Sequence, residues 1–248
     1  MKKKLIKVGL DQFGLTNRKF LILFLLHELS HEKNYPKSLH DKFRFQFPEM
    51  MHSYEYLCKV AKLMADEKLL LLKPSDRRNY FCITDKGIEL LPWHQVNFSE
   101  RLYEINKVLN RCILDLTGSC PLIPVERPLP IQFRPYFSKL VSVKDLVTYV
   151  ILNEVTLRRG IYMSEIYDLL QIKFGWESSN SYLYDISAEM EKNGLLIGLW
   201  EGEKRTRKFL TITEKGIDHF RQITDTTTER LLKVQTYLDQ ILTLLASK

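Results

Sequence analysis

Two short stretches of the sequence bring small hydroxyl residues to positions where the pattern predicts that a helix begins. In the second half these residues are Ser179, Asn180 and Ser181, and in the first half Ser53 holds the matching place. Hydroxyl groups and unpaired backbone amides at the start of a helix can bind a phosphate. Polar side chains farther along the exposed face of such a helix can reach base edges. The two stretches therefore suit contact with a nucleic acid.

Each stretch is followed by a charged segment between two strand-like runs, and cations there can follow a neighbouring phosphate backbone. Side chains alternate along a strand, so at most one of Arg207 and Lys208 can point at DNA. The candidate DNA contacts are Ser53, Tyr54, Tyr56, Lys59, Lys62, Arg77, Arg78, Asn79, Ser179, Asn180, Ser181, Tyr182, Tyr184, Lys204, Arg205, Arg207 and Lys208. A basic run at residues 2–7 can add an arm along the backbone or remain a solvated terminus.

Three carboxylates oppose this interpretation in the second half. Asp185, Glu189 and Glu191 lie in the same expected helix as the serines, and carboxylates repel phosphate unless they point away from it. The formal net charge of +7 is uneven, because residues 1–118 carry 20 Lys and Arg against 14 Asp and Glu, and residues 141–248 carry 14 against 15. The basic balance that favours a polyanionic partner therefore belongs mainly to the first half.

A six-residue element that occurs twice indicates how the chain is organised. The sequence ITDKGI at residues 83–88 returns 129 positions later as ITEKGI at residues 212–217. Each copy follows a strand-like run and precedes a long helical pattern. Solenoid repeats have periods of roughly 20–50 residues, so this longer spacing predicts a duplicated domain. A duplicated domain on one chain predicts a pseudo-dimer.

The second copy has the pattern of three helices, a hairpin and a long helix. The expected elements are helices at 143–155 and 161–174, a third helix after 178–181 that stops at 193–194, strands at 195–200 and 207–212, a helix opening at 213–216, and a long amphipathic helix over 231–245. Ser164 can cap the second of these helices, and Gly175 can close it. This element order is typical of a winged helix, in which the third helix enters a DNA groove.

The first copy follows the same order. Its expected elements are helices at 20–29, 38–45 and 52–68, strands at 69–72 and 79–84, and a long helix at 98–116. We favour the alignment of Leu69-Leu70 with Leu195-Leu196, because it keeps the core positions in phase and places Ser53 at Ser179. An alignment of the tyrosines of the two third helices is the alternative, and it needs an insertion of about two residues.

The segment between the copies is rich in proline. Residues 118–135 contain five of the nine prolines, which predicts a stiff, non-helical spacer. Its apolar residues, among them Leu129 and Phe133, make it too apolar for a free tether, so we expect it to pack along one domain.

Other chemistries find little support. The four cysteines form no CxxC pair, and their pattern favours reduced buried thiols in a cytosolic protein. His27 and His31 stand four apart without further ligands, so we expect no metal. No Ser, Cys or carboxylate constellation and no phosphate-binding glycine loop predicts an enzyme or a cofactor. The apolar run at 20–26 is too short to span a membrane, and no signal peptide is expected.

Residues 146–216 resemble the PadR family of bacterial winged-helix transcriptional regulators. The matching pieces are LVTYVIL at 146–152, GIYMSEI at 160–166, EKNGLL at 191–196 and RKFLTITEKG at 207–216. The first half is similar only through the hairpin and residues 83–88. Family members pair as homodimers through the long C-terminal helix, and some hold flat apolar ligands between the subunits. The resemblance therefore implies a fused pair held by residues 98–116 and 231–245, with room for a small apolar ligand between the halves.

We therefore expect a mainly α protein with small β-hairpins (α+β), built from two winged-helix domains in tandem with long C-terminal helices. The expected divisions are a first domain at 1–118, a linker at 119–140 and a second domain at 141–248. The expected function is sequence-specific binding of double-stranded DNA in transcription regulation, in the bacterial cytoplasm at the nucleoid, as a monomeric pseudo-dimer or a homodimer. Two alternatives stay open: a protein–protein adaptor, and a DNA-binding protein of replication or plasmid maintenance.

Overall fold

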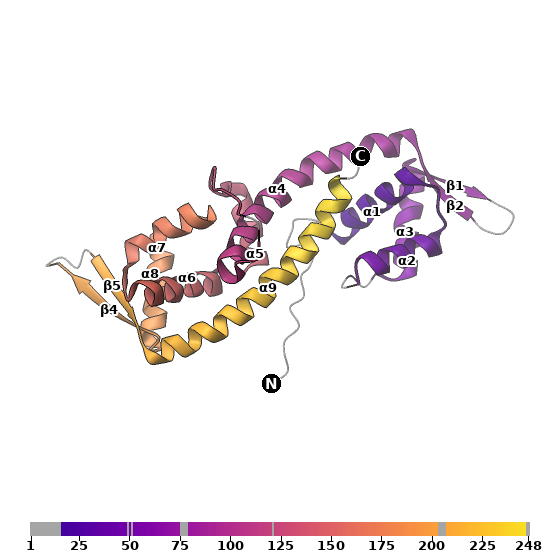
Figure 1. The fold of residues 1–248 in the computed structure, drawn as a ribbon. Coiled ribbons are helices and arrows are strands. Elements are labelled where there is room, and N and C mark those ends of the chain that lie inside the picture. Colours follow the sequence, from indigo (N-terminus) through magenta and orange to yellow (C-terminus); the bar gives the residue numbers. More distant parts are fainter. Residues whose placement is uncertain are drawn as a thin grey trace. The chain divides into compact units, whose positions relative to one another are not determined.

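The computed structural model describes residues 16–48, 50, 52–74, 79–120, 122–202 and 207–246. It is mainly helical with small antiparallel sheets, as the sequence predicts for an α+β protein (Figure 1). The chain divides into two compact units, one of Met1–Tyr103 with Tyr237–Lys248 and one of Glu104–Thr236. None of the described helices is both long and apolar enough to cross a membrane.

The first unit contains three helices, a hairpin and the start of a long helix. These are α1 (Asn17–His31), α2 (Pro36–Gln46), α3 (Tyr54–Asp66), β1 (Leu70–Pro74), β2 (Asn79–Ile83) and α4 (Asp85–Thr117), of which residues 85–103 belong to this unit. The hairpin pairs Leu70 with Ile83, and a single bridge from Asn34 to Phe81 adds a third segment to it. The α1 helix is apolar on almost every side, which suits its place at the centre of the unit.

The second unit repeats this order. It holds η2 (Ile131–Phe133), α5 (Arg134–Leu140), α6 (Val143–Arg158), β3 (Ile161–Tyr162), α7 (Met163–Leu169), η3 (Leu170–Phe174), α8 (Asn180–Lys192), β4 (Leu196–Glu201), β5 (Arg207–Ile212) and α9 (Glu214–Ala246). The strands form one antiparallel sheet in the order β3-β5-β4, in which Leu196 pairs with Ile212. Residues 214–236 of α9 belong to this unit, and its later residues belong to the first.

The α3 and α8 helices correspond residue by residue. Each is 13 residues long, and each is capped by a serine hydroxyl, Ser53 accepting from the Tyr56 amide and Ser179 from the Tyr182 amide. The buried residues correspond as well, as Leu57 with Leu183, Val60 with Ile186, Ala61 with Ser187 and Met64 with Met190. The alignment of Leu69 with Leu195 is therefore confirmed, and the alignment by tyrosines is wrong.

The repeated ITxKGI element is a structural junction in both units. The Thr84 hydroxyl donates to the Lys68 carbonyl at 2.7 Å and accepts from the Gly87 amide at 3.1 Å. The Thr213 hydroxyl donates to the Gly194 carbonyl at 2.7 Å and accepts from the Gly216 amide at 3.0 Å. One threonine in each unit therefore ties the end of the third helix to the start of the long helix.

Glycine is required at this junction because of a close approach between chain segments. A Cβ added to Gly87 would collide with the Leu69 carbonyl, and a Cβ added to Gly216 would collide with the Leu195 carbonyl. The lysine of each element also binds the end of the third helix, Lys86 through the Glu67 carbonyl at 3.0 Å and Lys215 through the Asn193 carbonyl at 2.8 Å. The sequence repeat therefore preserves a hydrogen-bonded joint.

The long helices are longer than the sequence pattern predicts. The α4 helix begins at Asp85 rather than at residue 98, and α9 runs unbroken from Glu214 through the threonine-rich segment. The exposed Pro92 is accommodated inside α4. In α9 the Thr224 and Thr226 hydroxyls donate to the Phe220 and Gln222 carbonyls, four residues earlier, at 2.8 and 3.0 Å, so these two threonines bond within the helix instead of ending it.

The proline-rich segment is not a uniform spacer, which corrects the prediction of a non-helical segment. It contains η2, and α5 begins at Arg134 with a proline in its first turn, where the missing amide costs nothing. As expected, the segment packs against one unit. Leu129 is buried, and the buried Arg111 guanidinium donates to the Ile123, Pro124 and Phe174 carbonyls at 3.0, 2.6 and 3.2 Å.

The second helix of the second unit begins differently from its prediction. Ser164 lies inside α7 and does not cap it. The N-cap is Tyr162, whose backbone amide donates to Glu165 Oε1 at 3.2 Å. Gly175 follows η3 with a φ of 70°, so the predicted glycine stop is confirmed.

Candidate nucleic-acid interface

The exposed face of α3 carries two of the predicted cations. Leu57, Val60 and Met64 are buried on the opposite face, so Lys59 and Lys62 lie on the solvent side of the helix. Glu55 and Asp66, which the sequence interpretation left out, are also exposed, at the first and last turns. The middle of this exposed face therefore presents two ammonium groups, with a carboxylate at each end.

A surface hollow of about 490 Å³ lies beside the start of α3. It is lined by Tyr35 and Lys37 at the start of α2, by Tyr54 of α3 and by Asn79 of β2. The structure therefore brings the predicted Tyr54 and Asn79 together, and it adds Lys37, which sequence reasoning missed. The signal for Lys37 was Pro36, because a proline at the first helical position places the next residue in the first turn.

Tyr56 is less accessible than predicted. It is half-buried, and its ring lies 5.3 Å from the ring of His52, which in turn contacts Phe43. Burial lowers the pKa of His52 below its usual value, so this imidazole is predominantly neutral at pH 7. Tyr56 and His52 therefore pack at the start of α3 and leave little of their surface for contact with a partner.

In the second unit two capped helix starts meet at one surface. Ser142 caps α6 and Ser179 caps α8, and both line a shallow hollow of about 610 Å³ with Tyr182, Lys144 and further residues. Asn180, Ser181 and Tyr182 are exposed, as predicted. Sequence reasoning missed Ser142 and Lys144, although their place at a predicted helix start was the available signal.

Lys208 corrects the predicted set of DNA contacts. It is 5% exposed, it forms an ion pair with Glu191, and its ammonium donates to the Ser187 hydroxyl at 3.3 Å. Arg207 is exposed and lies over the Tyr162 ring at 5.0 Å. The alternation of the two side chains is therefore confirmed, and Arg207 is the member that faces solvent.

Tyr184 also packs against the hairpin. Its ring stacks on Trp200 at 5.8 Å with an interplanar angle of 7°. It is half-buried, so only part of the ring reaches solvent.

The three carboxylates of α8 differ in their surroundings. Glu191 is paired with Lys208, and Glu189 accepts from Lys144 at 2.6 Å, so a cation accompanies each of them. Asp185 is exposed, and it occupies the position that Lys59 holds in α3. Two of the three acidic residues that oppose phosphate binding are therefore neutralised within the unit, and Asp185 remains.

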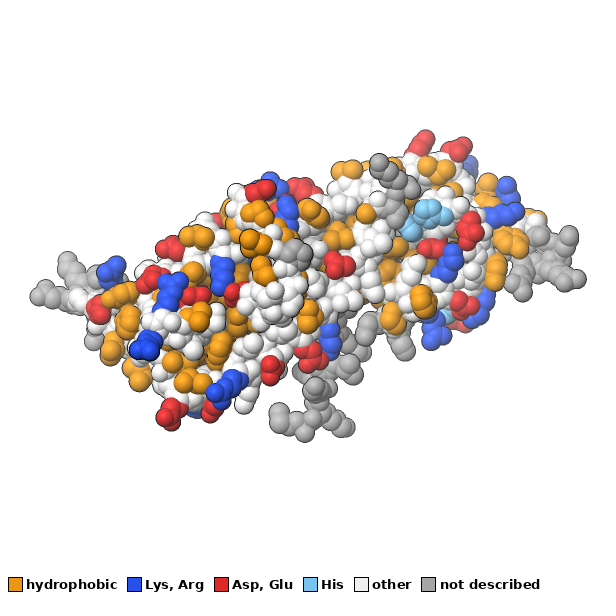
Figure 2. All heavy atoms as spheres, viewed as in Figure 1, with side chains coloured by type: hydrophobic (Ala, Val, Ile, Leu, Met, Phe, Trp, Pro, Cys, Tyr) orange, Lys and Arg blue, Asp and Glu red, His pale blue; other side chains and the backbone are white. Residues whose placement is uncertain are grey.

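Acidic and basic side chains are interspersed over both units on the face drawn in Figure 2. Arg77, Arg78, Lys204, Arg205 and the N-terminal lysines lie outside the described residues. Within the described residues, no group of three His, Cys, Asp or Glu side chains could hold a metal ion. No family model matches the sequence, and no curated protein matches it.

Proposed function

We propose that the chain is a sequence-specific double-stranded DNA-binding protein with two winged-helix domains, and that it regulates transcription. The observation that carries the proposal is the repeated surface of α3 and α8. Each helix begins at a serine cap, buries one apolar face and exposes a polar one, and is followed by a hairpin. A helix presented in this way suits entry into a major groove.

The charge distribution favours the first unit as the stronger DNA-binding element. Lys59 and Lys62 stand on α3 where α8 has Asp185 and Ala188. Each ammonium that meets a phosphate releases counterions and strengthens binding, whereas Asp185 repels phosphate. We therefore propose that α3 supplies most of the affinity and that α8 contributes through its serine-rich start.

The pseudo-dimer is supported by a contact between the long helices inside the second unit. The Gln235 amide of α9 donates to Asn110 of α4 at 2.6 Å, and Leu231 and Val234 are buried along the same stretch of α9. Pairing of long helices is the arrangement that the PadR resemblance implies, here within one chain.

Selection of bound duplexes from a random pool tests this function. We expect an enriched motif, and binding to it that weakens steeply as salt rises, through about 6–8 phosphates. Lys59→Ala with Lys62→Ala should reduce the slope of log K against log salt by about 2, since two phosphate contacts are lost. Lys233→Ala is the control, because that exposed lysine lies on α9 next to Glu229. No enriched motif, or an unchanged slope, would contradict the proposal.

One observation favours a second candidate, a protein–protein adaptor. The β4 strand exposes Ile197 and Leu199 at 53% and 59%. Apolar side chains on a sheet surface suit a protein partner better than a phosphate backbone. Ile197→Ser with Leu199→Ser should leave DNA binding intact under the first function and abolish partner binding under the second.

A further inference from the structure

The hollow beside the start of α3 combines aromatic rings with cations in a way that the second unit does not. Its volume is about 490 Å³, and we call it the aromatic hollow after its lining residues, Tyr35, Pro36, Lys37, Tyr54 and Asn79. Small-molecule sites in proteins have volumes of roughly 300–1,000 Å³. The aromatic hollow is therefore large enough for one nucleobase with its sugar.

A second ring holds each tyrosine of the aromatic hollow in place. The Tyr35 ring lies 6.2 Å from the Tyr80 ring at an interplanar angle of 89°. The Tyr54 ring lies 5.7 Å from the ring of the buried His40 at an angle of 82°. Tyr54 is still 39% exposed, and Tyr35 is half-buried. Both rings can therefore stack on a base, and stacking suits any base because every base has a π-face.

Backbone hydrogen bonds join the two sides of the aromatic hollow. The Asn34 amide donates to the Phe81 carbonyl at 3.1 Å, and the Phe81 amide donates to the Asn34 carbonyl at 2.8 Å. The Tyr35 amide donates to the Asn34 side-chain oxygen at 2.9 Å. Because this bridge ties the start of α2 to β2, the segments that carry Tyr35 and Asn79 are held together before a ligand binds.

Polar groups of two kinds accompany the rings. The Lys33 ammonium lies 5.8 Å from the centre of the Tyr80 ring, and the exposed Lys37 ammonium lies 3.0 Å from Asp41. An ammonium has three donors, so Lys37 keeps donors for a phosphate after it pairs with Asp41. Asn79 is exposed, and its amide has both donors and an acceptor, as a base edge does. Cations next to accessible rings are the combination that binds single strands.

The second unit lacks this combination. Its pairing of Ile161 with Leu210 stands where the first unit has the bridge of residues 34 and 81, which aligns the two surfaces. The corresponding residues are Tyr162 for Tyr35, Ser164 for Lys37, Asn180 for Tyr54 and Lys208 for Asn79. Lys208 is buried, and the Tyr162 hydroxyl donates to Glu201 at 2.8 Å. The fold therefore requires neither a lysine at position 37 nor a tyrosine at position 54.

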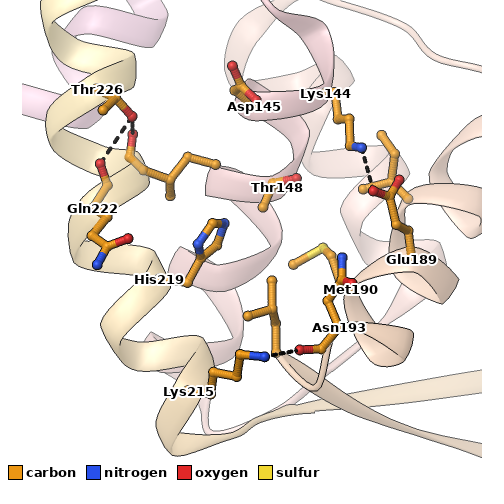
Figure 3. A pocket seen from close by; sticks show the side chains of 13 residues that line it. Lys144, Asp145, Thr148, Glu189, Met190, Asn193, Lys215, His219, Gln222 and Thr226 are labelled. Atoms are coloured by element: carbon orange, nitrogen blue, oxygen red, sulfur yellow. Dashed lines mark hydrogen bonds and ion pairs between the residues drawn. The ribbon is translucent and has the colours of Figure 1, made fainter. Parts of the chain in front are cut away.

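The hollow of the second unit drawn in Figure 3 has a different character. It lies between α6, α8 and α9, and no Phe, Tyr or Trp is among the described residues that line it. Its charged residues include Glu189, which Figure 3 shows paired with Lys144. It offers no ring for stacking, so it is not a second copy of the aromatic hollow.

We propose that the aromatic hollow binds one unpaired nucleotide of single-stranded DNA. The base stacks on the rings of Tyr35 and Tyr54, and the Asn79 amide meets the base edge. The ammonium groups of Lys33 and Lys37 meet the neighbouring phosphates. The proposal goes beyond duplex recognition and does not depend on it.

Fluorescence anisotropy of the full chain with labelled octathymidylate tests the proposal. An octamer of abasic sites is the matched probe, because it keeps the phosphates and loses every base. The octathymidylate should bind at least about tenfold more tightly, since only this probe can stack a base. Equal binding of the two probes, or no binding of either, would overturn the proposal.

Free thymidine monophosphate distinguishes a strand from a free nucleotide. As a competitor it should displace the octathymidylate only weakly, because it brings one phosphate and therefore meets fewer of the cations. If thymidine monophosphate binds as tightly as the octamer, the assignment to a single strand is wrong.

Two variants separate the ring from the charge. Tyr54→Asn and Lys37→Ser each install the residue that the second unit carries at the corresponding place, so both are compatible with the local fold. Tyr54→Asn should lower the affinity for octathymidylate by about tenfold and remove most of its advantage over the abasic octamer. Lys37→Ser should weaken both probes by about threefold, because a phosphate contact does not depend on the base. An unchanged advantage in Tyr54→Asn would refute the stacking role.

Lys233→Ser is the matched control for Lys37→Ser. Both lysines are ion-paired with a carboxylate four residues away, at 2.9 Å for Lys233 and 3.0 Å for Lys37, but Lys233 lies on α9 outside the aromatic hollow. Lys233→Ser should leave the binding of both probes unchanged. Equal losses in the two lysine variants would mean that Lys37 acts only through the overall charge. Circular dichroism melting checks that each variant is folded.

A photochemical cross-link locates the base in the unaltered chain. An octamer with one 5-iododeoxyuridine, irradiated in the complex, should attach at Tyr35 or Tyr54, and mass spectrometry of the peptides identifies the residue. Attachment only at residues outside the aromatic hollow would contradict the proposal even if the octathymidylate binds.

Discussion

Lys208 is ion-paired with Glu191 beneath the hairpin of the second unit, 5.5 Å from the centre of the Trp200 ring. The lysine comes from β5 and the carboxylate from α8, so the pair joins the sheet to the helix. Gly198 leaves space for it, because a Cβ at that position would collide with the Glu191 carboxylate. A cation that the sequence assigns to DNA is therefore part of the internal packing.

The first prediction concerns the stability of this pair. Lys208→Ala should lower the free energy of unfolding of the second unit by about 2–3 kcal/mol, because it leaves Glu191 without its cation in a partly buried place. Lys208→Met with Glu191→Gln should cost less, since both charges are removed together. Urea unfolding followed by tryptophan fluorescence measures this, because Trp176 and Trp200 lie in the second unit. If the double variant is as unstable as Lys208→Ala, the unpaired charge of Glu191 is not the cause of the lost stability.

The second prediction concerns the stability of the first unit at low pH. The His27 ring, 3.6 Å from Glu28, and the Lys42 ammonium, 3.0 Å away, lower the pKa of the buried Glu28 carboxyl to about 2. The folded pKa is depressed, so the stabilisation is present above pH 4.5 and is lost as the pH falls from 4.5 towards 2. The loss amounts to about 3 kcal/mol at most.

Hydrogen exchange of the α1 and α2 amides across this pH range measures the loss. Glu28→Gln should flatten the dependence of protection on pH in these helices. Glu55→Gln, at an exposed position of α3, is the matched control and should leave it unchanged. Equal pH dependence in the wild-type chain and in Glu28→Gln would rule out this carboxyl as the source.

The third prediction concerns Lys68, which has a φ of 61° where the second unit has Gly194 with a φ of 70°. A side chain in the left-handed region costs energy that glycine avoids. Lys68→Gly should therefore raise the free energy of unfolding of the first unit by about 0.5–1 kcal/mol, and Gly194→Lys should lower that of the second by about as much. Lys62→Gly, inside α3, should instead destabilise by about 1 kcal/mol. Thermal unfolding of the three variants shows whether each change raises or lowers the stability. If Lys68→Gly is destabilising, the positive φ of Lys68 does not cost the first unit stability.

The fourth prediction concerns the proline-rich segment. Arg111→Ala removes the donor to three carbonyls and should destabilise the second unit by about 3 kcal/mol. Arg111→Lys should recover only part of this, because an ammonium lacks the guanidinium fork. Hydrogen exchange of the Leu129 amide, which donates to the Gly175 carbonyl at 2.6 Å, reports on the attachment of the segment. Full protection of Leu129 in Arg111→Ala would mean that the arginine does not hold the segment.

The repeat, the three short helices, the hairpins and the serine caps of α3 and α8 could be predicted from the sequence, because apolar spacing and capping residues act locally. The extent of the long helices could not. Pro92 and the threonines near residue 226 are local breakers, yet each of the two helices runs through them for 33 residues. The role of Arg111 was also hidden, because its carbonyl partners are up to 63 positions away in sequence.

The candidate surface was only partly predictable. Exposure of Lys59, Lys62 and Ser181 follows from helical periodicity. The burial of Lys208 was not predictable, because strand alternation implies that one of Arg207 and Lys208 points inward but does not say which one. Lys37 was missed because it joins Tyr54 only through the packing of α2 against α3.

The threonine–glycine joint at residues 84–87 and 213–216 has a consequence for how each unit can move. At each joint the carbonyl before the strand rests on a glycine that has no room for another atom, so the hairpin and the long helix cannot reorient independently. If either hairpin is displaced, the long helix that follows it must therefore move as well.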